Sequence, residues 1–196
     1  MISSENLIYT LSFLDKSGWP DGPWKLEPDK MLWKDEETGY LCLMRRVAEL
    51  THHCGYVGVT KDHPLWRTQL LQFRRDKVLL DYFQGVHGFI TMAYPGKRFE
   101  SEPGPHNKIG IAPVDGLPNP EDIWWIGIDM VQNEDVVPII ADDPADNNPE
   151  RTYRDLGFLV RELQKLSGLI QKFKIEFEDG TLKFDRKEEP DPNWAR

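Results

Sequence analysis

The sequence predicts a single α+β domain, in which a mainly antiparallel sheet of about five strands carries one long C-terminal helix on a face. Short runs rich in Val, Ile and aromatic residues alternate with Gly and Pro turns, as antiparallel strands do. An apolar stripe near the C-terminus indicates the helix, and 196 residues are enough for one sizeable core. We expect a domain over residues 1–185 with its core over 22–172, followed by a loose, charged and proline-rich tail at 186–196.

The first predicted element is a short amphipathic helix over residues 4–16. Apolar residues recur there at steps of three and four, which places them on one helix face. They are Leu7, Ile8, Leu11 and Leu14. Serines before the pattern are suitable N-terminal caps, and the Gly- and Pro-rich residues 18–23 end the helix.

Apolar-rich runs further along the chain predict the strands. The turn segment 35–39 ends in Gly39, which can adopt a positive φ, and it predicts a hairpin between the first two runs. Gly55 and Gly58 lie inside the third run and indicate a bulge, or close approach by a ligand or another backbone. The predicted strands are 30–34, 40–47, 53–60, 85–94 and 123–131.

The connection between the last two of these runs, residues 95–121, contains six prolines and several glycines. It is longer than most connections between strands. We therefore expect a functional loop or a mobile flap, which could act as a lid over a binding site.

The clearest helix pattern covers residues 150–172. Apolar residues recur at steps of three and four and form one stripe, which must lie on a sheet face. They are Leu156, Leu159, Val160, Leu163, Leu166 and Ile170. Asn148 followed by Pro149 suits the start of this helix. Residues 174–184 then alternate around a Glu-Asp-Gly-Thr segment and predict a C-terminal hairpin.

Composition excludes several classes of protein. The formal charge of −9 argues against non-specific nucleic-acid binding, which needs a basic surface. No apolar run is long enough to span a membrane, and the N-terminus does not resemble a secretory signal. Two cysteines are too few for a disulfide scaffold, so we expect a cytoplasmic protein.

Common catalytic and metal motifs are absent from the sequence. It has no phosphate-binding loop, no dinucleotide-binding glycine pattern, no HExxH and no GxSxG. Cys42 and Cys54 do not form a C-x-x-C pair, so the common structural zinc sites are not expected, and we assign no metal ligands and no cofactor.

Adjacent His52, His53 and Cys54 form one group of reactive side chains. Strand alternation sends His52 and Cys54 to one face and His53 to the other. A thiolate beside an imidazole is the arrangement of a cysteine nucleophile. A buried structural cysteine with two surface histidines explains the same residues.

His87 and Asp129 are the candidate catalytic residues. His87 lies between Val86 and Gly88 in a predicted strand, where it could act as an acid, a base or a ligand, or be a hydrogen-bonded structural histidine. Asp129 ends the apolar run WWIGID, and a carboxylate there is costly unless it is paired, metal-bound or open to a cleft. The structural alternative is a capping or turn aspartate.

Aromatic residues provide further candidates for ligand binding. Trp124 and Trp125 must point to opposite faces of a strand, so one could form a stacking platform, or one lies in the core and the other at a rim. Tyr56 lies in the third predicted strand, and His63 precedes Pro64 in a turn, where it could also be an ordinary exposed residue.

Several short blocks occur in a fixed order between residues 22 and 138. They are Gly22-Pro23-Trp24, Glu27-Pro28-Asp29, Trp33, Thr38-Gly39, Cys42, Cys54 to Val59, His63-Pro64, Val86-His87-Gly88 and Trp124 to Asp129. Taken together, these blocks resemble an uncharacterised family of small proteins encoded by phages and prophages. The resemblance implies a phage protein working in the host cytoplasm, with a cleft around His87 and Asp129, but no established activity.

This chain departs from the family pattern beyond Asp129. Similar proteins often place a cysteine directly after the matching aspartate and a histidine two residues further on, where this chain has Met130 and Gln132. Asp135 and Pro138 are retained. Glutamine cannot exchange a proton and methionine is a poor ligand for hard metals, which argues against a metal or acid–base role for these two positions.

Three functions are consistent with the sequence. The first is a phage accessory protein whose cleft binds a small polar ligand, such as a nucleotide or a host signal molecule. The cleft residues would be Tyr56, His63, His87, Trp124 or Trp125, and Asp129. The second is a hydrolase in which His87 is the general base and Asp129 orients it or holds a divalent metal. The third is an acidic protein that inhibits a host enzyme, with the carboxylates of 134–150 and 176–191 on one face.

Overall fold

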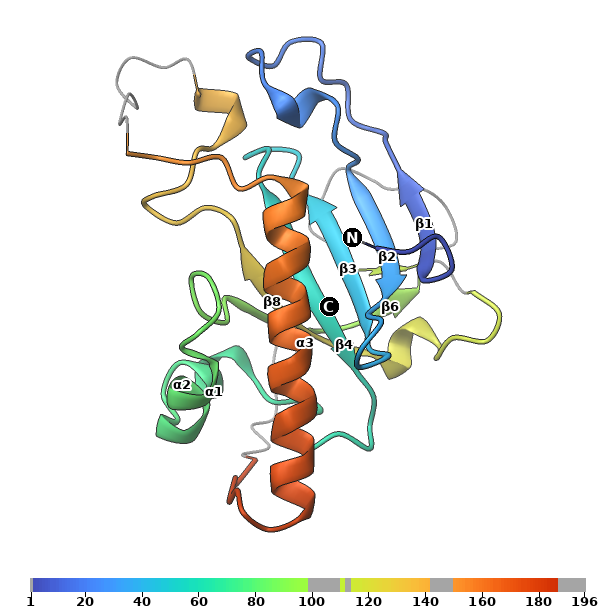
Figure 1. The fold of residues 1–196 in the computed structure, drawn as a ribbon, viewed down its shortest axis with the longest axis vertical. Coiled ribbons are helices and arrows are strands. Elements are labelled where there is room, and N and C mark those ends of the chain that lie inside the picture. The colour runs from blue at the N-terminus through green and yellow to red at the C-terminus, as the bar shows by residue number, and fades with distance from the viewer. Residues whose placement is uncertain (1, 99–109, 112–113, 142–149, 187–196) are drawn as a thin grey trace.

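The structure, a computed structural model, describes residues 2–98, 110–111, 114–141 and 150–186. It contains a six-stranded antiparallel sheet with a long helix on one face, which confirms the predicted α+β class (Figure 1). The sheet order is β1-β2-β3-β4-β8-β5. The strands are β1 (Leu7–Leu11), β2 (Lys30–Lys34), β3 (Leu41–Arg46), β4 (His53–Val59), β5 (Met92–Pro95) and β8 (Trp124–Asp129).

The central strands agree closely with the sequence pattern. β2 and β3 form the predicted hairpin, in which Lys34 pairs with Leu41 and Gly39 adopts a φ of 73° in the turn. β4 then pairs with β3 on one side and with β8 on the other. Apolar-rich runs were sufficient to predict these strands, because almost all of their residues are buried within the paired sheet.

The predicted helix over residues 4–16 is wrong, because Leu7–Leu11 form β1 and pair antiparallel with β2. An isolated helix of this length is marginal in water. Pairing with β2 instead satisfies the backbone groups along the outer edge of the sheet. The next residues are held by Asp29, whose Oδ2 accepts hydrogen bonds from the backbone N–H groups of Phe13 and Leu14.

The predicted strand over residues 85–94 is wrong in its first part, since only Met92–Pro95 form β5. Residues 85–91 are a turn region after two short helices that were not predicted. Gly88 (φ 65°) and Phe89 (φ 62°) adopt left-handed conformations that a strand cannot contain. The helices are α1 (Leu70–Phe73) and α2 (Lys77–Phe83), and Asp76 caps α2 by accepting from Val78 and Leu79.

Helix α3 (Leu156–Glu178) begins later and ends later than predicted. Asp155 caps its start by accepting a hydrogen bond from the Phe158 N–H, whereas Asn148 and Pro149 lie outside the described residues. The predicted hairpin over 174–184 is also wrong. Its turn residue Gly180 (φ 80°) follows the helix end instead, where a left-handed residue is common.

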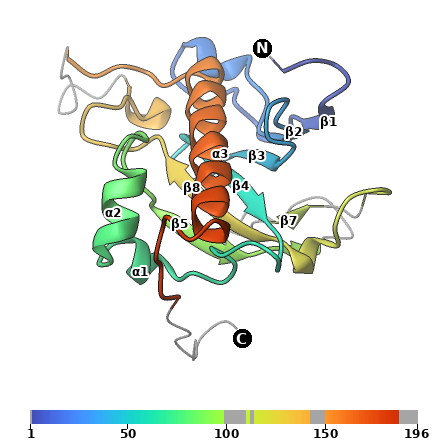
Figure 2. The same cartoon turned by 60° about the horizontal axis from the view of Figure 1, so that its bottom comes forward.

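The core occupies both faces of the sheet. On one face α3 lies across β4, with α1 and α2 beside it, and the apolar stripe of α3 packs into a large cluster (Figures 1 and 2). A smaller cluster lies on the other face. Trp124 belongs to the first cluster and Trp125 to the second, which confirms that they point to opposite faces.

The remaining short elements lie around this sheet. They are the parallel pair β6 (Lys97–Arg98) and β7 (Gly110–Ile111), and the 3-10 turns at Pro23–Lys25, Pro120–Asp122 and Pro138–Ile140. Residues 99–109 and 112–113 of the predicted flap 95–121, and residues 187–196 of the predicted tail 186–196, fall outside the described residues. Among the described helices, none combines the length and apolar character needed to cross a bilayer.

Candidate functional site

A histidine–carboxylate pair lies at the end of β8 closest to the start of α3. The ring Nε2 of His87 is 2.8 Å from Oδ2 of Asp135. The Asp135 side chain is fully buried, whereas that of His87 is 10% exposed. His87 therefore has a carboxylate partner, but that partner is Asp135 and not Asp129.

Asp135 is fixed by two further donors. Its Oδ2 also accepts from the backbone N–H of Gln132 at 2.9 Å, and its Oδ1 accepts from Nε of Arg154 at 2.7 Å. These contacts offset the cost of burying the carboxylate. A carboxylate can only accept from the ring, so this contact favours the tautomer with its hydrogen on Nε2, in which Nδ1 is an acceptor.

Helix α3 holds His87 from the other side. The backbone N–H of His87 donates to Oε2 of Glu162 at 2.9 Å, and its ring packs edge-on against Phe158 with centroids 5.2 Å apart. The following residue, Gly88, has no room for a side chain, because a Cβ would lie 2.4 Å from Nε2 of Gln132. The next residue, Phe89, has a left-handed backbone with a φ of 62°, which is strained for a residue other than glycine and is the kind of strain that occurs at functional sites.

Gln132 connects Asp129 to this pair. Its side-chain Nε2 donates to Oδ1 of Asp129 at 2.7 Å, and its backbone N–H donates to Asp135. Asp129 is half-buried at the end of β8. We use the name His87 site for His87, Asp129, Gln132, Asp135 and the exposed Glu134 that lies beside them.

Three side chains of the site could in principle hold a metal ion. The ligand atoms of His87, Glu134 and Asp135 lie within 4.8 Å of one another. Both oxygens of Asp135 are already hydrogen-bonded, one of them to the guanidinium of Arg154. Because a bound cation would have to displace this positive charge, Asp135 is better suited to orient His87 than to bind a metal.

The other predicted cleft residues do not join this site. Tyr56, Trp124 and Trp125 are buried in the core, and the two tryptophans belong to different clusters, so the prediction of one at a rim is wrong. The Tyr56 hydroxyl contacts Sδ of Met92. These residues cannot line one cleft with His87.

His63 is also a structural residue rather than an exposed or ligand-binding one. Its Nδ1 accepts from the Leu65 N–H at 3.0 Å, and its Nε2 lies 3.2 Å from the Ile170 carbonyl oxygen. Burial lowers the pKa of His63 to about 4. The neutral ring therefore connects the chain after β4 to α3.

His52 and Cys54 lie on one face of the strand and His53 on the other, as predicted, but Cys54 is not an activated nucleophile. Sγ of Cys54 lies 3.5 Å from Nε2 of His52, on one face of β4. Burial raises the pKa of Cys54 to about 12, so the thiol stays protonated and is a poor nucleophile at neutral pH. His53 is buried on the other face, where burial and then Arg46 lower its pKa.

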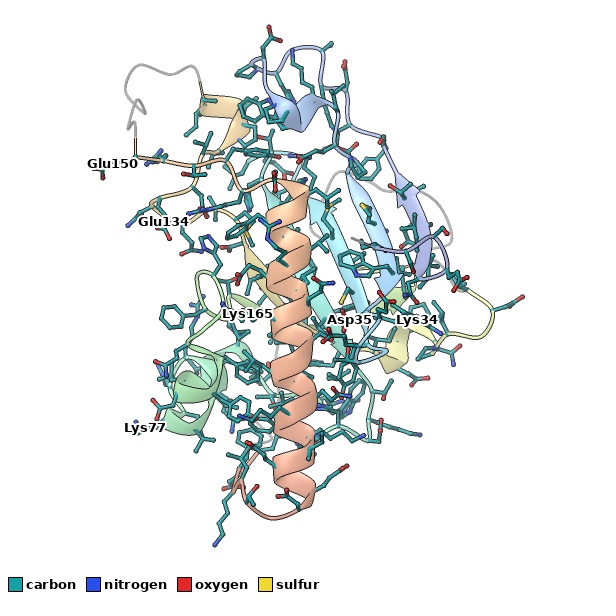
Figure 3. The ribbon with its side chains drawn as sticks, in the orientation of Figure 1. Lys34, Asp35, Lys77, Glu134, Glu150 and Lys165 are labelled. Atoms are coloured by element: carbon teal, nitrogen blue, oxygen red, sulfur yellow. The ribbon has the colours of Figure 1, made fainter. Side chains whose placement is uncertain are left out.

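The carboxylates of the third hypothesis lie partly outside the described residues, at 142–149 and 187–191. Of the described ones, Glu134 and Glu150 lie near the start of α3 (Figure 3), and the Glu134 carbonyl accepts from the Thr152 N–H. Glu176 and Glu178 are in the last turn of α3, roughly 30 Å along the helix from its start at 1.5 Å per residue. The single acidic surface of the third hypothesis stays a prediction.

Sequence reasoning missed the residues that organise the site. The sequence indicates Asp135 only through the resemblance to phage proteins, and it does not indicate Arg154 or Glu162. Asp135 and Thr152 form a short parallel bridge that brings Arg154 beside the carboxylate. No local spacing signals this contact, because it depends on how the segment before α3 crosses the end of β8.

Comparison with known proteins does not add to this geometry. No protein-family model, no curated protein and no solved structure matches the chain. The resemblance to phage-encoded proteins therefore stays a prediction, and the function has to be inferred from the His87 site.

Proposed function

We propose that this chain binds a small polar ligand at the His87 site, as a phage-type accessory protein. The observation that carries the proposal is the 2.8 Å contact between Nε2 of His87 and the fully buried Asp135. This contact fixes the ring orientation and leaves Nδ1 as a hydrogen-bond acceptor for a ligand. Because Asp135 and α3 already hold the His87 ring in one orientation, less conformational entropy is lost when a ligand binds.

The surroundings of His87 indicate what the ligand must offer. Nδ1 of His87, the exposed carboxylate of Glu134 and the half-buried carboxylate of Asp129 are all acceptors. We infer a neutral or cationic group with several N–H donors, such as an amino-substituted heterocycle. The base of a nucleoside meets this requirement, whereas a bare phosphate would be repelled by the carboxylates.

The phage setting is the second part of the proposal and depends on the resemblance. A small phage protein in the host cytoplasm could sequester a host signal molecule that contains such a base. Binding alone would be sufficient for this role, so it requires no turnover.

A native mass spectrum of the purified chain, compared with the spectrum of the denatured chain, tests the binding function. We expect wild type to carry a small-molecule adduct, either from the host cell or after incubation with adenosine or cytidine. His87→Gln should lose the adduct, because the amide cannot reproduce the paired imidazole. Lys77→Gln, which removes an exposed lysine of α2 that pairs with Asp81, is the matched control and should keep it.

Two results would contradict the binding function. One is an adduct that persists at full occupancy in His87→Gln when circular dichroism shows an intact fold. The other is a clean apo mass for wild type at millimolar adenosine and at millimolar cytidine.

A hydrolase is the second candidate, with Asp135 in the orienting role that the sequence analysis gave to Asp129. In an oriented general base, a buried carboxylate holds one ring nitrogen and the other nitrogen takes the proton. His87 fits this pattern, since no hydrogen bond of its Nδ1 occurs among the described residues. Nδ1 would then take a proton from an attacking water. Incubation of adenosine or cytidine in ¹⁸O-water distinguishes the candidates, since only hydrolysis places ¹⁸O in a product. If a product contains ¹⁸O, Asp135→Asn should reduce the rate of hydrolysis by roughly 100-fold or more. If the nucleosides are recovered without ¹⁸O, hydrolysis of these two probes is ruled out.

A further inference from the structure

A small pocket lies at the opposite end of the sheet from the His87 site. Its volume is about 230 Å³, and it is formed on the face of β2, β3 and β4 that α3 does not cover. The register of β4 and β8 separates the two places, since Cys54 pairs with Asp129 at one end and Val59 pairs with Trp124 at the other. The lining residues are Lys34, Gly39, Tyr40, Leu41, Gly58, Thr60, Gly116, Leu117, Pro118 and Ile123.

The walls of this pocket are mostly apolar. Leu41 and Ile123 are buried members of the second core cluster, and Leu117 packs against the same cluster. Gly58 lines the pocket without a side chain. A larger residue would not fit there, because its Cβ would lie 2.7 Å from Cγ2 of Ile123. Such walls favour the apolar body of a ligand.

The pocket lining contains one cationic side chain, beside the hydroxyl groups of Tyr40 and Thr60. Lys34 is exposed and is the charged residue among the lining side chains, none of which is a carboxylate. Figure 3 labels Lys34 next to Asp35, whose carboxylate instead accepts from Ser167 of α3. No ion pair of Lys34 occurs within the described ranges of the chain.

One acidic side chain near the pocket, Asp62, is already paired, and the exposed Glu36, Glu37 and Asp115 do not line the pocket. The hydroxyl of Thr60, a lining residue, donates to Asp62, and Asp62 forms an ion pair with Lys174 at 2.9 Å. Tyr40 remains uncharged, because burial raises its pKa. A chain with a net charge of −9 therefore has a pocket whose lining carries a single positive charge.

We propose that this pocket is a binding site for a small organic acid, with the carboxylate at Lys34 and the apolar body against Leu41, Leu117 and Ile123. A volume of about 230 Å³ corresponds to roughly eight water molecules at about 30 Å³ each. One aromatic ring or a short aliphatic chain with one carboxylate fits that space. This site is independent of the His87 site and of its proposed ligand.

Titration with benzoate, followed by amide NMR of the full chain, tests this site. Benzyl alcohol and benzylamine are the probes of matched shape with no charge and with positive charge. We expect saturable shifts centred on Gly58, Thr60 and Gly116, with benzoate binding more tightly than either other probe. Lys34→Gln should weaken benzoate binding roughly threefold to fivefold, as expected for one exposed ionic contact, and should leave benzyl alcohol binding unchanged.

Two further variants complete the experiment. Leu117→Trp should fill the pocket and weaken all three probes, whereas Lys77→Gln removes an exposed lysine on α2, remote from the pocket, and should change nothing. Equal affinity for the three probes, unchanged benzoate binding in Lys34→Gln, or no saturable shift at millimolar benzoate would overturn the proposal.

Discussion

The described histidines differ in what surrounds each ring. His52, His53 and His63 are buried, and burial is the main reason why the pKa of each is lowered. His87 lies closer to solvent and has a buried carboxylate on one nitrogen. A paired, partly accessible ring suits binding or proton exchange, whereas a buried neutral ring mainly supports the fold.

His63 should make the stability of the protein depend on pH. Its folded pKa of about 4 lies below the usual value of 6.5, so the unfolded chain binds more protons between these values. The stabilisation is complete above pH 6.5 and is lost as the pH falls towards 4. From pH 7 to pH 5 we expect a loss of about 2 kcal/mol in the free energy of unfolding from this residue alone.

Urea unfolding at pH 7 and pH 5 measures this effect, with His63→Gln as the comparison. The variant should show a smaller decrease between the two pH values, because glutamine does not titrate. An NMR titration that placed the pKa of His63 near 6.5, or the same decrease in both proteins, would contradict the assignment.

The contact between α3 and β4 depends on one residue without a side chain. A Cβ at Gly55 would lie 2.6 Å from Cδ1 of Leu159 and 2.9 Å from both Cδ atoms of Leu163. The glycines of this strand predicted a bulge, or close approach by a ligand or another backbone. At Gly55 this prediction is wrong, because β4 pairs without a register shift and the approaching groups are leucine side chains of α3. Side chains from the apolar stripe fill the space above Gly55.

Gly55→Ala should destabilise the protein by about 1–3 kcal/mol, because the added methyl group overpacks this contact. Gly168→Ala is the matched control on α3, where a Cβ meets no atom within 4 Å. That substitution should stabilise the protein by up to about 1 kcal/mol through helix propensity. Urea unfolding of both variants measures the difference, and a Gly55→Ala protein as stable as wild type would contradict the tight packing.

At the scale of the whole molecule, a buried charge network joins three distant segments. Arg46 of β3 is fully buried, and its Nη2 lies 2.8 Å from Oε2 of Glu27. Oε1 of Glu27 accepts from the Leu156 N–H at the start of α3, and the Tyr153 hydroxyl donates to Oε2. An ion pair between Nζ of Lys16 and Oδ1 of Asp29, 2.7 Å apart, extends the network towards the N-terminal segment.

Glu27→Ala should cost about 3–5 kcal/mol in the free energy of unfolding, because it leaves the buried Arg46 without this partner. The loss should be nearly independent of salt, since buried pairs are screened little. Asp21→Asn is the control, as it removes the exposed partner of Lys25 and should leave stability unchanged. Urea unfolding at low and high salt tests both, and a neutral Glu27→Ala would show that the network does not support the fold.

The sequence was sufficient for the elements whose patterns are local. Apolar-rich runs correctly predicted β2, β3, β4 and β8. Strand alternation correctly predicted the opposite faces of Trp124 and Trp125, and the placement of His52 and Cys54 on one face. The turn at Gly39 followed from its tolerance of positive φ. These features depend on side-chain direction and backbone sterics within a few residues.

Only the tertiary structure decided the rest. The spacing of Leu7 and Leu11 fits either a helix or a strand, and the unpaired edge of β2 selected the strand. His87 and Asp135 are 48 residues apart, and they meet because residues before and within α3 cross the end of β8. A hydrogen bond between distant residues depends on how packed elements are placed, and local periodicity carries no record of that placement.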